Sequence, residues 1–268
     1  MTSTAPPVSQ LQAPATWRSV DFISDLHLQA SEASTFEVWQ RYMARTPADA
    51  VLILGDLFEV WVGDDAVAQN PFLQSCAAVL KSAGQRLYLG LMHGNRDFLM
   101  GESFVQDCHA HFLTDPTALH FGVKTWLLSH GDALCIADVD YQQFRSQVRT
   151  PQWRSDFLKQ PLAERQAVAR SIRNQSEARK QAGADTGSRE VYADADSALS
   201  QSWLAQTGAR TLIHGHTHQP AEHLLPHSAA DPARARWVLS DWDAGAQPPR
   251  AQVLRLFESG QHARIDLI

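Results

Sequence analysis

Five short apolar runs punctuate the chain, and each one ends at a motif of metal-ligand residues. They are rich in Val, Ile, Leu, Tyr and Trp, and they span residues 20–23, 50–54, 86–92, 125–128 and 211–213. Short continuous runs of this kind predict buried strands, and residues 251–257 and 263–268 predict two more that complete a sheet. We therefore expect an α/β fold in which the carboxyl ends of several strands meet at one binding crevice.

The motifs that follow these runs supply two carboxylates, one carboxamide and four imidazoles. This set is about what two adjacent divalent metals require when one carboxylate bridges them. Taken singly the motifs are weak, because an Asp can cap a helix and a Gly-Asn pair can form a tight turn. Their order and their placement at strand ends together favour a dimetal hydrolase. The motifs are Asp25-Leu26-His27, Gly55-Asp56, Gly94-Asn95-Arg96-Asp97, His130-Gly131-Asp132 and Gly215-His216-Thr217-His218.

Composition limits where such a protein works. The 268 residues are 44% hydrophobic, which is enough for a core, yet no apolar stretch approaches the roughly 20 residues of a membrane span. Residues 1–17 lack the basic start and apolar centre of a signal peptide, so we expect a disordered extension and a cytoplasmic protein. Three cysteines without a CxxC pair agree with a reducing compartment, and Cys135 is interpreted as a buried, inert thiol.

Residues 141–189 form a basic region, with ten Lys or Arg against four acidic residues. Apolar residues recur there at helical intervals, which predicts a helical insertion over 138–205 within a domain of residues 18–268. The insertion could simply pack on the sheet and expose a charged face. It could also form a cap, because it begins shortly after His130 and returns shortly before His216, and its charge suits an anionic substrate.

The order of the five motifs resembles that of the calcineurin-like metallophosphoesterase superfamily, over a span from about Asp21 to Asp241. The resemblance implies an α/β/β/α sandwich, in which two sheets are flanked by helices. It also implies two divalent metal ions that share a bridging Asp56, with Mn²⁺ as the typical activating ion. The donor set is compatible with Mn²⁺ but does not exclude zinc or iron. One ion would be held by Asp25, His27, Asp56 and His218, and the other by Asp56, Asn95, His130 and His216.

Longer strings at residues 22–28, 53–65, 93–99 and 213–220 resemble one branch of this superfamily. Its members cleave the diphosphate of UDP-2,3-diacylglucosamine, a nucleotide-activated glycolipid, in lipid A biosynthesis. The resemblance implies attack of hydroxide on the α-phosphorus, which gives UMP and 2,3-diacylglucosamine 1-phosphate.

Arg96 stands where many superfamily members have His. Its guanidinium could bind a phosphoryl oxygen and stabilise charge in the transition state, or it could be a surface arginine in a turn. The resemblance assigns catalysis to Arg96, Asn95 and Asp56. It assigns substrate contacts to Asn95, Arg96, Asp138, Tyr141, Ser176, Lys180 and His216. The alternatives are a helix cap for Asp138, a core position for Tyr141 and a solvated helix face for Ser176 and Lys180.

The insertion also carries an apolar stripe that could hold acyl chains or belong to the core. If the stripe is open, the neighbouring basic residues would attract anionic lipid and place the protein peripherally at the cytoplasmic face of the inner membrane. A nuclease or a metal-free scaffold remains an alternative, although no regular aromatic and basic interleaving indicates a nucleic-acid partner. The stripe consists of Phe144, Val148, Trp153, Phe157, Leu158, Leu162, Val168 and Ile172.

Overall fold

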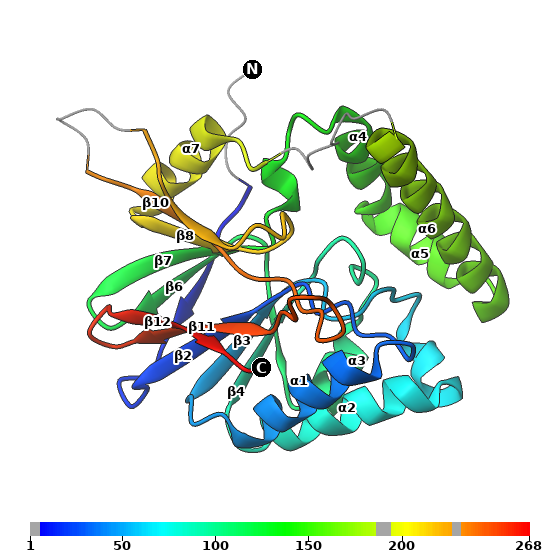
Figure 1. Ribbon diagram of the computed structural model, residues 1–268, viewed down its shortest axis with the longest axis horizontal. Coiled ribbons are helices and arrows are strands. Elements are labelled where there is room, and N and C mark those ends of the chain that lie inside the picture. The colour runs from blue at the N-terminus through cyan, green and yellow to red at the C-terminus, as the bar shows by residue number, and fades with distance from the viewer. Residues whose placement is uncertain (1–5, 186–193, 227–231) are drawn as a thin grey trace.

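The computed structural model describes residues 6–185, 194–226 and 232–268, except for the side chains of 174–185. Two six-stranded sheets pack face to face, and helices cover both outer faces (Figure 1). Helices α1 (Ala33–Arg45), α2 (Pro71–Gly84) and α3 (Glu102–Asp107) lie on one sheet, and α7 (Ser197–Thr207) lies on the other. The implied α/β/β/α sandwich is confirmed.

The five predicted strands form the centres of these sheets. The first sheet has the order β12-β11-β2-β3-β4-β5, and the second has the order β1-β6-β7-β8-β10-β9. Strands β2 to β5 run parallel, as do β7, β8 and β10. The first sheet comprises β2 (Ser19–Ile23), β3 (Ala50–Leu54), β4 (Tyr88–Met92), β5 (His111–Leu113), β11 (Gln252–Phe257) and β12 (His262–Asp266). The second comprises β1 (Ser9–Gln12), β6 (Thr117–Phe121), β7 (Lys124–Ser129), β8 (Thr211–His214), β9 (Ala221–Leu224) and β10 (Ala235–Val238).

The core has three layers, because each sheet is covered on both faces. Phe22 and Leu52 of the first sheet meet Leu128 of the second between the sheets. Trp39 of α1 packs on the outer face of the first sheet, and Trp203 of α7 packs on the outer face of the second. Burial on both faces explains why the central strands are continuous apolar runs rather than alternating ones.

The expectation of a disordered extension is wrong for residues 6–17. Residues 9–12 form β1, which pairs in parallel with β6 at the edge of the second sheet. Beyond it the backbone N–H of Ala13 donates to the carbonyl of His120 at 2.9 Å, and the Trp17 ring lies 5.1 Å from that of Tyr88. Backbone pairing needs no apolar pattern, so the polar composition of this segment did not indicate a strand. Residues 1–5 lie outside the described part of the chain.

The described residues between 138 and 205 form four helices, which divide into two parts. Helices α4 (Val139–Val148), α5 (Pro151–Leu158) and α6 (Leu162–Asp185) form a group beside the sandwich, whereas α7 belongs to a layer of the sandwich itself (Figure 1). We call α4 to α6 the cap. Within the described residues, no helix combines the length and the apolar character that crossing a bilayer demands.

Candidate dimetal site

The seven candidate ligands come from five loops, each at the carboxyl end of a central strand. Asp25 and His27 follow β2, and Asp56 follows β3. The second sheet contributes from the ends of β7 and β8, which face the same edge. The remaining ligands are Asn95 after β4, His130 after β7, and His216 and His218 after β8.

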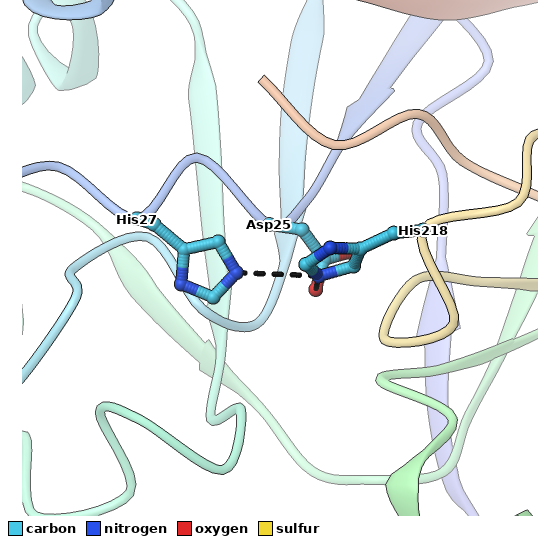
Figure 2. A group of neighbouring side chains, drawn as sticks. All are labelled: Asp25, His27 and His218. Atoms are coloured by element: carbon cyan, nitrogen blue, oxygen red, sulfur yellow. Dashed lines mark hydrogen bonds and ion pairs between the residues drawn. The ribbon is translucent and has the colours of Figure 1, made fainter. Parts of the chain in front are cut away.

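One group of ligands surrounds Asp25 (Figure 2). The Nε2 atoms of His27 and His218 lie 3.3 Å apart, and His218 Nε2 is also 3.3 Å from Asp25 Oδ1. Asp25 is completely buried, and its Oδ1 accepts no hydrogen bond of regular geometry within the described residues. Imidazole nitrogens and a carboxylate oxygen thus converge on one point, as the ligands of a divalent cation do.

A second group surrounds Asn95. Its Oδ1 lies 3.0 Å from His130 Nε2 and 2.9 Å from His216 Nδ1. Asp56 Oδ2 lies 3.7 Å from His130 Nε2 and 4.0 Å from His27 Nε2. Asp56 therefore stands between the two groups, where a carboxylate that bridges two ions has to be.

The backbone at these positions is unusual. Asp25, His27, Asp56, His216 and His218 all have positive φ, from 47° to 68°, and the only other described non-glycine residue with positive φ is His109. Such a conformation costs about 1–3 kcal/mol per residue and persists where the surrounding structure enforces it, often at functional sites. At His216 and His218 the positive φ also curls the loop, so that residues two apart can face the two neighbouring groups of ligands.

Two glycines allow the loops to approach one another closely. A Cβ atom on Gly94 would overlap the carboxylate and the backbone nitrogen of Asp56, and one on Gly215 would overlap the carboxylate of Asp25. Neither Gly94 nor Gly215 has positive φ, so these two glycines are required by the lack of space for a side chain.

The electrostatics of the site favour a bound cation. Burial raises the pKa of Asp25, but His218, His130 and His27 together hold it well below its usual range. Burial lowers the pKa of His130, yet the charges of Asp56 and Asp25 raise it to about 9. Two buried carboxylates thus create a potential that attracts positive charge, and together with the donor set this fits a pair of divalent metal ions.

Arg96 lies at the mouth of this site. Its backbone N–H donates to Asp56 Oδ1 at 2.7 Å, and its side chain helps to line a cavity of about 280 Å³ with His27, His216 and His218. Since that side chain faces the cavity with only 24% of its surface exposed, the alternative of an exposed turn arginine does not describe it.

The predicted substrate contacts Asp138 and Tyr141 are not among the residues that line this cavity. Asp138 caps α4 by accepting from the backbone N–H of Tyr141 at 3.0 Å, so its helix-cap interpretation holds. The Tyr141 hydroxyl donates to Asp132 Oδ2 at 2.5 Å, and its ring lies 5.9 Å from that of His216. Ser176 and Lys180 lie on α6 where the side chains are outside the described residues.

Much of the cap's positive charge is used to attach the cap to the sandwich. Arg145 and Arg149 contact the buried Asp132 at 2.8 and 3.4 Å, and Arg165 donates to Asp65 and to the carbonyl of Val62. These three arginines hold the cap against the sandwich, so they do not form a free positive surface.

The apolar stripe of the cap divides into residues that pack against the core and residues that remain exposed. Val148 and Phe157 are buried, and Phe144, Trp153 and Leu162 pack against the same core cluster. Leu158, Val168 and Ile172 remain 38%, 39% and 41% exposed. This last group has the largest exposed fraction of the stripe.

Sequence reasoning gave no role to three carboxylates that hold the site together. Asp97 accepts from the backbone N–H groups of Gly94 and Leu57, both at 2.8 Å. Glu59 lies 3.1 Å from His27 Nδ1, and Asp132 anchors the cap. The sequence offered one signal for them, which is an acidic residue within a stretch that is otherwise expected to be buried. Acidic residues are seldom buried without a partner, so each of these positions indicates a buried contact.

Comparisons with known proteins agree with this geometry. Residues 18–220 match the family model described as calcineurin-like phosphoesterase. The chain is 44% identical to a UDP-2,3-diacylglucosamine hydrolase of Chromobacterium violaceum, covering 85% of this chain and 92% of the relative. It is 42% identical to a protein of that name from Aromatoleum aromaticum, with 86% and 95% covered, and 39% identical to one from Ralstonia nicotianae, with 95% of each covered. The chain therefore belongs to the calcineurin-like phosphoesterase family.

Proposed function

We propose that this chain is a dimetal hydrolase that cleaves the diphosphate of UDP-2,3-diacylglucosamine into UMP and 2,3-diacylglucosamine 1-phosphate, a step of lipid A biosynthesis. The observation that carries the proposal is the convergence of six ligand-type side chains on the two sides of a seventh, Asp56. The substrate is taken from the relatives that share about two fifths of the sequence and bear the name of this hydrolase.

Asp25, His27, Asp56 and His218 would hold one ion, and Asp56, Asn95, His130 and His216 the other. When bound, two divalent ions supply Lewis-acid polarisation of the phosphoryl oxygens and lower the pKa of a coordinated water. We propose Mn²⁺, since imidazole, carboxylate and carboxamide ligands without a thiolate suit it.

The protein's own residues orient the diphosphate. Arg96 lines the cavity and would bind a phosphoryl oxygen with two parallel hydrogen bonds, which would stabilise charge that develops on oxygen in the transition state. Its guanidinium stays protonated near neutral pH, so it acts as a charge and not as a proton donor. Asn95 and His216 of the ligand set would contact the same substrate, and Asp138, Tyr141, Ser176 and Lys180 would add contacts from the cap.

The exposed apolar residues of the cap would receive the acyl chains. Leu158, Val168 and Ile172 are the members of the stripe that the core does not cover. A lipid substrate also requires access to a membrane, so we propose peripheral attachment at the cytoplasmic face of the inner membrane. Vesicle flotation with anionic and neutral lipids tests this attachment separately from catalysis.

The test of function compares wild type, Asp56→Asn and Arg96→Ala by metal content and by turnover of UDP-2,3-diacylglucosamine, with single-stranded DNA as a second substrate. We expect wild type to bind two ions and to release UMP. Asp56→Asn should lose bound metal and turnover, and Arg96→Ala should keep both ions but turn over more slowly. Full activity in Asp56→Asn, or preferential cleavage of the DNA, contradicts the proposal.

A further inference from the structure

Glu59 is held rigidly between two ligand loops. Its backbone N–H donates to the carbonyl of Leu28 at 3.2 Å, directly after His27. Two residues later, the N–H of Trp61 donates to the carbonyl of Arg96 at 3.1 Å. The segment 59–61 thus joins the loop after β2 to the loop after β4, and this fixes the backbone from which the Glu59 side chain extends.

The Glu59 carboxylate connects three functional groups, although it is only 12% exposed. Its Oε2 lies 3.1 Å from His27 Nδ1, at ion-pair distance, although the angle is not that of a regular hydrogen bond. Its Oε1 lies 3.4 Å from Arg173 Nε on the cap and 3.7 Å from Arg96 Nη1. Within the described residues, no other acceptor forms a hydrogen bond with His27 Nδ1.

This contact bears on the tautomer of His27, that is, on which ring nitrogen carries the proton. A carboxylate beside Nδ1 favours the tautomer protonated there, which leaves the Nε2 lone pair facing His218 and Asp56. Carboxylates commonly hold metal-binding histidines in this way, and their removal typically costs 10–100-fold in metal affinity or activity.

We propose that Glu59 is a positioning residue that holds the His27 imidazole in its metal-binding orientation and tautomer, an inference that rests on the dimetal site proposed above. The same carboxylate joins that ligand to Arg96 and to the cap through Arg173. Glu59 therefore contacts both a proposed metal ligand, His27, and the proposed substrate-binding residue Arg96.

The histidine ligand His218 also has a carboxylate near its Nδ1 atom, but at a longer distance than in His27. His218 Nδ1 lies 3.9 Å from Asp241 Oδ2, and Asp241 already accepts hydrogen bonds from the Nε and Nη2 of Arg250 at 2.9–3.1 Å. The Asp241 carboxylate is thus hydrogen-bonded to Arg250, whereas the Glu59 carboxylate lies 3.1 Å from His27 Nδ1. We expect Asp241→Asn to change metal affinity less than Glu59→Gln does.

The experiment measures Mn²⁺ affinity by competition with a chelating indicator in full-length protein, for wild type, Glu59→Ala, Glu59→Gln and the charge control Glu37→Gln. Glu37 lies exposed on α1 and is not among the residues that line the cavity at the candidate ligands. Parallel measurements are the melting temperature of metal-free protein, kcat and KM, and the ¹⁵N signature of the His27 tautomer. We expect Glu59→Ala to weaken one of two Mn²⁺ sites by about 10–100-fold. The Gln variant should be intermediate because its amide oxygen can still accept a hydrogen bond.

The outcomes separate this inference from the proposed function. If wild type binds no Mn²⁺, the dimetal proposal itself fails. If wild type binds two ions and both Glu59 variants bind them with unchanged affinity, the positioning role is overturned. The positioning role is also overturned if the loss of Mn²⁺ affinity in the Glu59 variants is fully explained by a lower stability of the metal-free protein, measured as its melting temperature. It is overturned as well if Glu37→Gln weakens Mn²⁺ binding as much as the Glu59 variants do. Should Glu59→Ala fail to fold, the Gln variant and its His27 tautomer decide the question.

Discussion

Adjacent residues of α5 provide a sharp test of the acyl-binding role of the cap. Phe157 is 7% exposed and stacks on Trp153 with ring centroids 4.7 Å apart, whereas Leu158 is 38% exposed. Phe157→Ala should therefore cost about 3–5 kcal/mol of folding free energy, and lower the melting temperature by about 6–20 °C. Activity on small and lipid substrates should fall in parallel if the folded fraction falls.

The exposed members of the stripe should behave differently. Leu158, Val168 and Ile172 are each about 40% exposed, and full burial of such a side chain is worth about 2 kcal/mol, so acyl contact could add about 0.8 kcal/mol at each. Replacing all three by Ser should then raise KM for the diacylated substrate by about 50-fold. Because each side chain is already about 60% buried, the same arithmetic costs about 1.2 kcal/mol of folding free energy at each position and about 3.6 kcal/mol in all, so the melting temperature should fall by about 7–14 °C. The folded protein should still hydrolyse the small phosphodiester at the wild-type rate, which separates loss of acyl contact from loss of the fold.

The assay compares KM for UDP-2,3-diacylglucosamine with hydrolysis of a small chromogenic phosphodiester, beside a thermal melt of each variant. The reasoning is refuted if the triple variant retains its KM for the lipid. It is equally refuted if the variant loses both activities together with its stability, because that pattern marks core residues.

Three further predictions follow from the site and the core. Gly94→Ala should push the Asp56 carboxylate out of place and reduce turnover by about 100-fold, with loss of bound metal measured by elemental analysis; normal metal content would contradict the packing argument. Restoring Mn²⁺ to chelated protein at 100 times its dissociation constant should add about 2.7 kcal/mol per ion and raise the melting temperature by about 5–10 °C, and an unchanged melt would count against metal binding. Burial raises the pKa of Cys76, Cys108 and Cys135 to about 12, so a thiol reagent at pH 8 should modify them only after denaturation; rapid labelling of native protein would show that they are accessible.

The central strands and the ligand loops were predictable because both leave local signals. A strand buried on both faces must be a continuous apolar run, and a ligand at its carboxyl end follows that run directly, as at Ile23 and Asp25. Parallel pairing then brings distant loops to one edge. The positive φ of Asp25, His27 and Asp56 could not be predicted, because only the surrounding loops enforce it.

Features that depend on pairing between distant residues were missed. The polar strand β1 gains its place from backbone hydrogen bonds with β6, which leave no trace in side-chain pattern. The basic composition of the cap suggested a charged surface, but Arg145 and Arg165 turn out to meet carboxylates more than ten and about 100 residues away. Ion pairs of this kind are visible only once the chain has folded.

The central claim is hydrolysis at the α-phosphorus of the nucleotide-activated glycolipid. Its most direct test is turnover of UDP-2,3-diacylglucosamine with Mn²⁺ in ¹⁸O-labelled water, followed by mass spectrometry of both products. The claim predicts one labelled oxygen in the phosphate of UMP and none in 2,3-diacylglucosamine 1-phosphate. Label in the lipid product would mean attack on the β-phosphorus and would contradict the placement of the substrate, and the absence of UMP would contradict the proposed function itself.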